Sequence, residues 1–388
     1  MREQLVQEFK KIFGDGGEIK VYFAPGRVNL IGEHTDYNGG HVFPCALTIG
    51  TYAVARKNDS TKLRFYSMNF DHLGILTGDV NELDYNKKDG WTCYPKGIIW
   101  TMKKRGFEIP KGMDILYFGN IPNGSGLSSS ASIEVLTGLV LRDMWNLPVS
   151  NQDLALIGQY SENQYNGVNC GIMDQFAIAM GQKNKAIFLD TATLDFEYAD
   201  IDLKDSKIVI LNTNKKRGLG DSKYNERRAE CETALAELQK VVKIHSLGEL
   251  TEQQFETYKG AILDEDRKKR AKHAVYENQR TIKAVKALKQ GKLDEFGQLM
   301  IASHKSLQYD YEVTGKELDT LVDAALRQEG VVGARMTGAG FGGCAVSIVK
   351  SDSIDRFIEN VGREYEEKIG YKADFYVVEI GNGPIILE

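Results

Sequence analysis

Cysteine is scarce in this chain of 388 residues, which has five cysteines scattered between Cys45 and Cys344. Their number is odd, and no two of them form a CxxC pair. These features argue against a zinc ribbon and against a framework of disulfide bonds. We therefore expect the protein to work in a reducing compartment, of which the cytoplasm is the simplest.

Long hydrophobic runs are also missing, since no stretch approaches the ~18 consecutive apolar residues of a membrane span. Residues 1–13 mix apolar Leu5, Phe9 and Ile12 with charged side chains. That spacing predicts an amphipathic helix and not a secretory signal peptide. We expect no membrane partner.

An excess of positive charge is absent, because 49 lysines and arginines face 54 aspartates and glutamates, for a net charge of −5. Proteins that bind nucleic acid usually present a basic face. We therefore expect no nucleic-acid partner and a small-molecule ligand that is recognised through local charges.

Proline is rare as well, with seven residues in the chain, and no Pro/Ser linker or internal repeat is present. The hydrophobic share of 42% and charged share of 27% are those of an ordinary globular protein. A chain of this length favours two or three domains. An acidic, irregular stretch between two strand-like runs predicts a boundary near residue 200, which gives domains of residues 1–200 and 201–388.

Strand-like and helical patterns are mixed along the chain, which predicts the α+β class. The strand-like runs include residues 20–24, 51–56, 62–67 and 207–212. The helical patterns include residues 132–145, 151–166, 221–242 and 256–290.

The first of three glycine-rich regions is residues 24–40, APGRVNLIGEHTDYNGG, which follows a strand-like run. Arg27, Glu33, His34 and Asp36 offer hydrogen-bond donors and acceptors, the mixture that a polyhydroxy ligand needs. A turn-rich loop with solvated charges is an alternative. A metal site that includes His41 is another, although the spacing fits no helix-borne ligand pattern.

The second region, residues 119–132, reads GNIPNGSGLSSSAS and leads from a strand-like run into the helical pattern at 132–145. Small residues let a backbone approach its ligand, and free N–H groups at a helix N-terminus bind phosphate. Neither a Walker loop nor a GxGxxG fingerprint matches. We therefore interpret this region as an anion cradle, with a Ser/Gly linker as the alternative.

The third region, residues 335–345, has four glycines in six positions before a strand-like run. Two glycines would suffice for a tight turn, so four suggest close contact of the backbone with the cradle or the ligand. Two acidic residues complete the set. Glu162 lies in the helical pattern at 151–166, and Asp174 stands in an apolar run. A partly buried carboxylate there needs a partner or a role, or it caps a helix.

Taken together, these motifs resemble those of the galactokinase family, a branch of the GHMP kinase superfamily. Residues 26–40 are similar to the galactokinase signature, and the second and third glycine-rich regions are similar to two further GHMP motifs. The likeness continues in CGIMDQF (170–176), RRAEC (227–231), RAKHAVYE (270–277) and residues 297–319. It therefore spans nearly the whole chain, and the 27–36 segment is specific for the galactokinase branch.

The resemblance implies a two-domain GHMP fold with the active site in the cleft between the domains. The N-terminal domain would be like the second domain of ribosomal protein S5, and the C-terminal domain would be ferredoxin-like. The implied reaction is ATP-dependent phosphorylation of α-D-galactose at C1, with Mg²⁺ as cofactor. The family is often monomeric, so a monomer is expected.

The resemblance also implies roles for individual residues. Arg27 and Asp174 correspond to the catalytic pair. The implied sugar-binding positions are Glu33, His34, Thr35, Asp36, Gly171 and Tyr224. The implied ATP-binding positions are Ser67, Trp91, Gly124, Ser125, Gly126, Leu127, Ser128, Ser129, Ser130 and Ala131. The implied Mg²⁺ ligands are Ser130 and Glu162.

One departure from the family pattern bears on the choice of sugar. Asn169 stands where many relatives carry proline, and Asn166 lies in the same loop. Two other functions are therefore kept as alternatives. One is a kinase for N-acetylgalactosamine or L-arabinose, and the other is a non-catalytic sensor of galactose and ATP.

Overall fold

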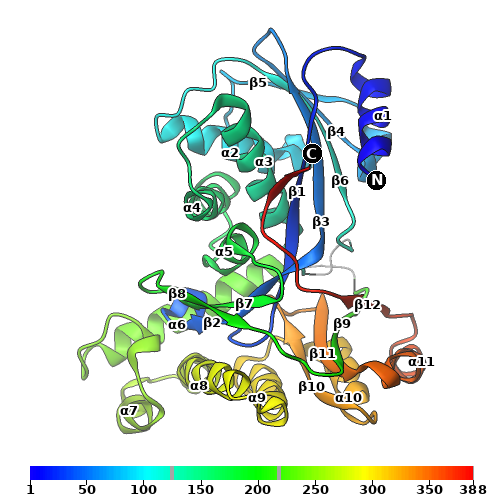
Figure 1. Cartoon of the computed structure of the whole chain (residues 1–388). Coiled ribbons are helices and arrows are strands. Elements are labelled where there is room, and N and C mark those ends of the chain that lie inside the picture. The colour runs from blue at the N-terminus through cyan, green and yellow to red at the C-terminus, as the bar shows by residue number, and fades with distance from the viewer. Residues whose placement is uncertain (123–125, 216–219, 388) are drawn as a thin grey trace.

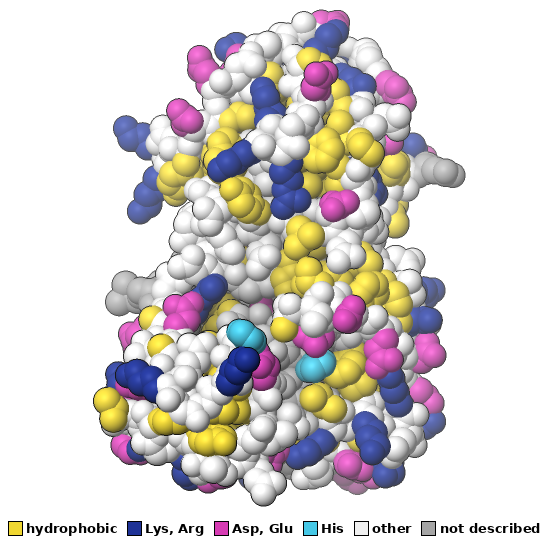
Figure 2. Space-filling view, turned by 90° about the vertical axis from the view of Figure 1, so that its left-hand side faces the viewer, with side chains coloured by type: hydrophobic (Ala, Val, Ile, Leu, Met, Phe, Trp, Pro, Cys, Tyr) yellow, Lys and Arg dark blue, Asp and Glu magenta, His cyan; other side chains and the backbone are white. Residues whose placement is uncertain are grey.

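The computed structural model describes residues 1–122, 126–215 and 220–387. Figure 1 shows a large sheet with its helices in the upper half and a smaller sheet with its helices in the lower half. On the face drawn in Figure 2, basic and acidic side chains are interspersed, as expected for a nearly balanced net charge. Within the described ranges, no helix combines the length and apolarity needed to cross a membrane.

The upper sheet has the strand order β13-β1-β3-β6-β4-β5, and β4 with β6 is its parallel pair. Its strands are β1 (Lys20–Asn29), β3 (Pro44–Lys57), β4 (Lys62–Ser67), β5 (Leu76–Asp79), β6 (Met113–Gly119) and β13 (Ile385–Leu387). Side chains alternate between the two faces of these strands. Tyr22 and Ala53 pack under the helical layer, whereas Val21 and Val54 face α1 (Arg2–Phe13) on the other side.

Helices cover the inner face of the upper sheet (Figure 1). They are α2 (Cys93–Lys104), α3 (Ser129–Trp145), α4 (Asn151–Ser161) and α5 (Met173–Met180). The predicted helix at 132–145 thus begins three residues earlier. The predicted helix at 151–166 is α-helical to Ser161 and continues as a π-helical turn, Glu162–Asn166.

The lower sheet is antiparallel, with the order β10-β11-β9-β12. Its strands are β9 (Ser206–Asn212), β10 (Val331–Thr337), β11 (Cys344–Lys350) and β12 (Asp374–Val378). A third, small sheet joins β2 (His41–Val42), β7 (Lys185–Asp190) and β8 (Phe196–Asp200). Apolar side chains of β9 and β11 pack with those of β1 and β3 in one cluster, which joins the two halves of the molecule.

The helices of the lower half are α6 (Gly220–Leu238), α7 (Glu252–Tyr258), α8 (Glu265–Lys289), α9 (Leu293–Ser306), α10 (Gly315–Leu326) and α11 (Ile354–Ile369). Short 3₁₀ helices occupy Asp36–Asn38, Met68–Leu73, Lys87–Thr92, Leu247–Glu249, Lys259–Ala261 and Ser351–Ser353, and a second π-helical turn occupies Leu307–Tyr311. The single helix predicted at 256–290 is wrong, because Asp264 accepts a hydrogen bond from the Arg267 amide and so caps a new helix.

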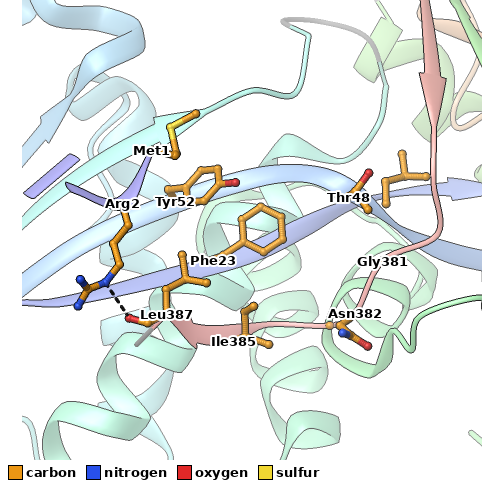
Figure 3. Close-up of a pocket in the computed structure, with 11 residues that line it drawn as sticks. Met1, Arg2, Phe23, Thr48, Tyr52, Gly381, Asn382, Ile385 and Leu387 are labelled. Carbon is orange, nitrogen blue, oxygen red and sulfur yellow. Dashed lines mark hydrogen bonds between the residues drawn. The ribbon is translucent and has the colours of Figure 1, made fainter. Parts of the chain in front are cut away.

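The C-terminal segment returns to the upper sheet, where β13 pairs with β1 from Val21↔Leu387 to Phe23↔Ile385 (Figure 1). A pocket of about 410 Å³ lies beside this segment. Figure 3 shows Phe23 and Tyr52 between Met1 and Ile385 among the residues that line it. None of the predicted site residues that the structure describes lines it.

Candidate functional site

The predicted catalytic pair, Arg27 and Asp174, is in direct contact. Arg27 lies in β1 and donates from Nε to Asp174 Oδ1 at 2.8 Å, and its Nη2 forms an ion pair with the same oxygen at 2.7 Å. Ser128 Oγ donates to the second oxygen, Oδ2, at 2.5 Å. The Asp174 side chain, in the first turn of α5, remains 33% exposed, whereas that of Arg27 is 4% exposed. The carboxylate is therefore held by the protein and still open to a ligand.

The serine-rich loop leads directly into α3, which begins at Ser129. Ser128 has a left-handed conformation, with φ 62°, and this turn aims its side chain at Asp174. The first N–H groups of an α-helix have no partner inside the helix and favour an anion. Gly126, Ser129 and Ser130 are partly or fully exposed here, whereas Leu127 and Ala131 are buried in apolar clusters. Gly124 and Ser125 lie outside the described residues.

The third glycine-rich region packs against this loop and so confirms the close backbone contact that its glycines suggest. A Cβ on Gly338 would lie 3.0 Å from the Gly126 carbonyl oxygen and 3.7 Å from Arg27 Nη2. Gly338 also has φ +84°, which L side chains rarely adopt. Glycine is thus required at Gly338 by both space and backbone conformation.

Asp36 and Gly171 are pressed together on the other side of Asp174. A Cβ on Gly171 would fall 1.9 Å from Asp36 Oδ2, and the same oxygen accepts from the Met173 amide at 3.4 Å. Burial, with a further contribution from the charge of Asp174, raises the pKa of Asp36 to about 6. Gly171 therefore makes room for a carboxylate that binds a proton more readily than usual.

His34 and Tyr224 form an aromatic wall near Asp36. Their ring centroids are 5.6 Å apart, and the ring of Tyr37 lies 5.5 Å from that of Tyr224. His34 Nδ1 is 2.7 Å from the Tyr37 hydroxyl, which in turn is 2.8 Å from the hydroxyl of Tyr311. Burial lowers the pKa of His34 to about 3, so its ring is neutral at physiological pH.

Glu33 and Thr35 are fully buried and their polar atoms contact the protein. Glu33 accepts hydrogen bonds from the Asn29 side chain and from the Gly338 amide. The Thr35 hydroxyl lies 2.9 Å from the Gly32 carbonyl and 2.7 Å from the His41 carbonyl. In this conformation both residues stabilise the loop, whereas Asp36 reaches the start of α5 through its hydrogen bond from the amide of Met173, next to Asp174.

The two predicted metal ligands come from different helices. Ser130 lies in the first turn of α3, and Glu162 opens the π-helical turn that follows α4, a type of distortion that is frequent at functional sites. Glu162 is 6% exposed. Among the described residues, no group of three or more His, Cys, Asp or Glu side chains could hold a metal ion.

The remaining predicted nucleotide positions, Ser67 and Trp91, lie beside β6, the strand that leads to the serine-rich loop. Ser67 pairs with Tyr117 of β6 and caps a 3₁₀ turn by accepting from the Asn69 amide at 3.3 Å. The Trp91 ring meets the Tyr117 ring edge-on, with centroids 5.6 Å apart.

Sequence reasoning did not single out Tyr37, Tyr311, Glu134 or Gln175, which contact the predicted site residues. Tyr37 lies inside the 24–40 motif, and Gln175 directly follows Asp174. Glu134 stands four positions after Ser130, on the same face of a helix. Tyr311 lies in the family-like segment 297–319 but in none of the glycine-rich motifs, and it approaches the site from the lower half of the molecule.

Comparison with known protein families gives three matches along the chain. Residues 7–57 match the galactokinase galactose-binding signature, residues 94–182 the N-terminal domain of GHMP kinases, and residues 284–367 the C-terminal domain of GHMP kinases. These matches confirm the predicted two-domain GHMP fold of mixed helices and sheets.

Curated relatives match over almost the full length. A galactokinase of Clostridium beijerinckii is 60% identical over 98% of this chain and 97% of its own. A galactokinase of Ligilactobacillus salivarius is 57% identical over 98% of both chains. The crystal structure of Lactococcus lactis galactokinase complexed with galactose is 52% identical, covers 100% of both chains and superimposes with a TM-score of 0.98.

Proposed function

Because the chain belongs to the galactokinase family of GHMP kinases, we propose that it transfers the γ-phosphoryl group of ATP to the C1 hydroxyl of α-D-galactose. The products are galactose 1-phosphate and ADP, and the reaction begins galactose catabolism. The observation that carries this proposal is the contact between Arg27 and Asp174 at 2.7 Å, next to the serine-rich loop. The Asp174 carboxylate is still partly exposed and can therefore reach a ligand.

Asp174 is proposed to accept the proton of the C1 hydroxyl as phosphoryl transfer proceeds. Its hydrogen bonds from Arg27 and Ser128 fix the direction of the carboxylate. Arg27 is permanently charged and stabilises the negative charge that develops on the sugar oxygen. Positioning and charge neutralisation supply most of the rate in phosphoryl transfer.

The sugar is proposed to bind among Asp36, His34, Tyr224 and the Gly171 backbone, with Glu33 and Thr35 shaping the loop behind it. The close approach of Asp36 to Gly171 supports this assignment, because only a residue without a side chain leaves room for the carboxylate there. A hydrogen-bonding wall of this kind rejects sugars that lack the matching hydroxyl. The galactose-bound relative supports galactose as the ligand.

ATP is proposed to place its phosphates on the loop at 124–131 and its base near Ser67 and Trp91. The free N–H groups at the start of α3 suit phosphate. Mg²⁺ is proposed to bind the Ser130 hydroxyl and the Glu162 carboxylate. The donor set fits, since both are hard oxygens and Glu162 is buried near a second carboxylate. Bound Mg²⁺ neutralises charge on the phosphates and completes its shell with water.

The remaining expectations are proposals as well. We place the domain boundary near residue 200, between β8, which ends at Asp200, and β9, which begins at Ser206. The five cysteines are free thiols, which suits a reducing cytoplasm. A monomer is expected, and light scattering of the purified protein measures it.

A sugar panel tests the function. The purified protein is incubated with MgATP and galactose, N-acetylgalactosamine, L-arabinose or glucose, and ADP and sugar phosphate are measured. We expect equal amounts of ADP and galactose 1-phosphate, and little turnover of glucose. The curated relatives do not favour a kinase for another sugar or a sensor. Turnover of another sugar alone, or galactose binding without turnover, would overturn the proposal.

A further inference from the structure

Glu134 lies in α3 one helical turn after Ser130, and its side chain is completely buried. Residues at this spacing share one face of a helix, and helical side chains tilt back toward the N-terminus. The Glu134 carboxylate therefore projects toward the turn that carries Ser130. On its other side it meets Gln175, whose Nε2 donates to Glu134 Oε2 at 3.1 Å.

Glycine at position 158 of α4 lets these two side chains reach this place. A Cβ on Gly158 would lie 2.9 Å from Gln175 Cγ and 3.7 Å from Glu134 Cβ. Three helices thus close around the Glu134 carboxylate, and Gln175 connects it to α5, directly beside Asp174.

The carboxyl group of Glu134 is in hydrogen-bonding contact with that of Glu162, so two carboxyl groups meet here. No N–H or hydroxyl group of the described residues donates to the buried Glu134 Oε1, and none donates to the carbonyl oxygen of Gln175. Nor does a lysine or arginine among them form an ion pair with Glu134. An unsatisfied buried carboxylate oxygen is costly, so the native site supplies something to it.

The surroundings of Glu134 carry negative charge. Glu162 is its neighbour, and Asp174 also acts on it. The same carboxylates act on Cys170. Burial of its thiol, and then the charges of Glu162, Glu134, Asp174 and Asp36, raise its pKa. Among the residues that the structure describes, Arg27 is the cation that forms an ion pair with these carboxylates, and its guanidinium is held by Asp174. The carboxylates near Glu134 thus outnumber the cations that the described residues supply, and a further positive charge beside Glu134 would neutralise them.

We propose that Glu134 is a third protein ligand of the divalent cation, whose Oε1 binds the metal from within the helical layer while Ser130 and Glu162 bind it from the phosphate side. This inference rests on the proposed function for the presence of the cation. Two carboxylates and one hydroxyl leave the remaining positions for phosphate oxygens and water, as is usual for Mg²⁺.

The test measures metal binding directly. Mn²⁺ is titrated into the full-length protein with ADP, and free Mn²⁺ is followed by electron paramagnetic resonance. We expect Glu134→Gln, which keeps the shape and removes the charge, to weaken Mn²⁺ binding by about ten-fold or more. Glu134→Asp keeps the charge but shortens the side chain, which moves its oxygen away from the metal. We therefore expect Mn²⁺ binding to weaken in this variant as well. Glu162→Gln is the reference for loss of a ligand.

Asp143→Asn is the matched control, because Asp143 is a carboxylate of the same helix that binds Lys20 and Tyr22 instead. We expect Mn²⁺ binding by Asp143→Asn to equal that of the wild type. The thermal midpoint of Glu134→Gln without metal should equal or exceed that of the wild type, because the amide relieves the contact between two buried carboxyl groups. The rise in midpoint on adding Mn²⁺ and ADP should be smaller in Glu134→Gln.

Mn²⁺ binding by Glu134→Gln within two-fold of the wild type, while Glu162→Gln loses it, would overturn the inference. So would a thermal midpoint that falls without metal while Mn²⁺ affinity stays unchanged, since that marks a structural role only. The proposed function fails differently, by absence of galactose phosphorylation in the wild type. The two failures are therefore distinguishable.

Discussion

Glu277 and Glu134 are both completely buried carboxylates, yet opposite charges surround the first and like charges surround the second. Glu277 in α8 receives a hydrogen bond from Arg280 at 2.8 Å and lies 3.8 Å from Arg335. Burial alone would raise its pKa, but Arg280 and the neighbouring charges lower that pKa to about 2. Arg335 also lies 3.7 Å from Glu33, so one guanidinium serves two carboxylates.

Around Glu134 the described residues form no such ion pair, and burial followed by the charge of Glu162 raises the pKa of Glu134 well above the ordinary value. The contrast separates two uses of buried charge. Around Arg335 the chain neutralises its own carboxylates and so fixes the loop at 24–40. Near the serine-rich loop it leaves negative charge for a ligand to neutralise.

Among the carboxylates near the serine-rich loop, Asp174 is the one whose change, Asp174→Asn, has the largest expected effect. The amide cannot accept the proton of the sugar hydroxyl, so we expect kcat to fall by about 10²- to 10⁴-fold. Binding of ATP should change little, because the phosphates are expected to contact the loop and not Asp174. Steady-state ADP release and ATP binding by calorimetry measure the two quantities. A kcat close to that of the wild type would exclude Asp174 as the proton acceptor.

Arg335→Met tests the group that the protein neutralises by itself. It leaves Glu33 and Glu277 buried beside an apolar side chain, so we expect the free energy of unfolding to fall by about 3–5 kcal/mol. Urea denaturation measures the loss. Lys283→Gln is the control, since Lys283 forms an exposed ion pair with Glu252, and its effect should stay within about 0.5 kcal/mol. An equal effect of both changes would contradict the distinction drawn above.

The pH dependence of stability gives the smallest effect but shows opposite signs for Asp36 and Glu277. Asp36 keeps its proton up to a pH of about 6 in the folded state, so stability should fall as the pH rises toward that value from about 4. Glu277 has a pKa of about 2, so the stability that it adds is present above about pH 4 and is lost as the pH falls.

Unfolding of the wild type, Asp36→Asn and Glu277→Gln across this pH range separates the two contributions. We expect the free energy of unfolding of Asp36→Asn to rise relative to that of the wild type between about pH 4 and 6. Only the wild type has the Asp36 carboxyl group, which lowers its stability as the pH rises through this range. The deficit of Glu277→Gln should shrink below about pH 4. Parallel curves for all three proteins would contradict both assignments.

Much of the fold could be predicted from local patterns, and the exceptions have physical reasons. Apolar alternation predicts the strand at 20–24, but β1 continues to Asn29. Its second half contains Pro25, Gly26 and Arg27, which strand patterns do not predict, and the pairing with β3 resumes there after an irregularity. The predicted helix at 151–166 ignores the π-helical turn, because hydrophobic spacing does not distinguish it from an α-helix.

The candidate site could be predicted as far as its residues lie in short motifs. Arg27, Asp174 and the serine-rich loop are examples, and the structure brings them together. The contact between Glu33 and the Gly338 amide joins residues 305 positions apart, and no local pattern announces it. Glu134 carried a usable signal, its spacing from Ser130, but its missing partner is visible only in three dimensions.

The pairing of β13 with β1 has a consequence for the synthesis of the protein. The ribosome makes β1 long before its edge partner, Ile385–Leu387. Throughout that interval one edge of β1 has unpaired backbone groups, which another nascent chain could pair with. The upper sheet thus keeps an open edge until Ile385–Leu387 has been made, and a polypeptide that stops before these residues retains that open edge.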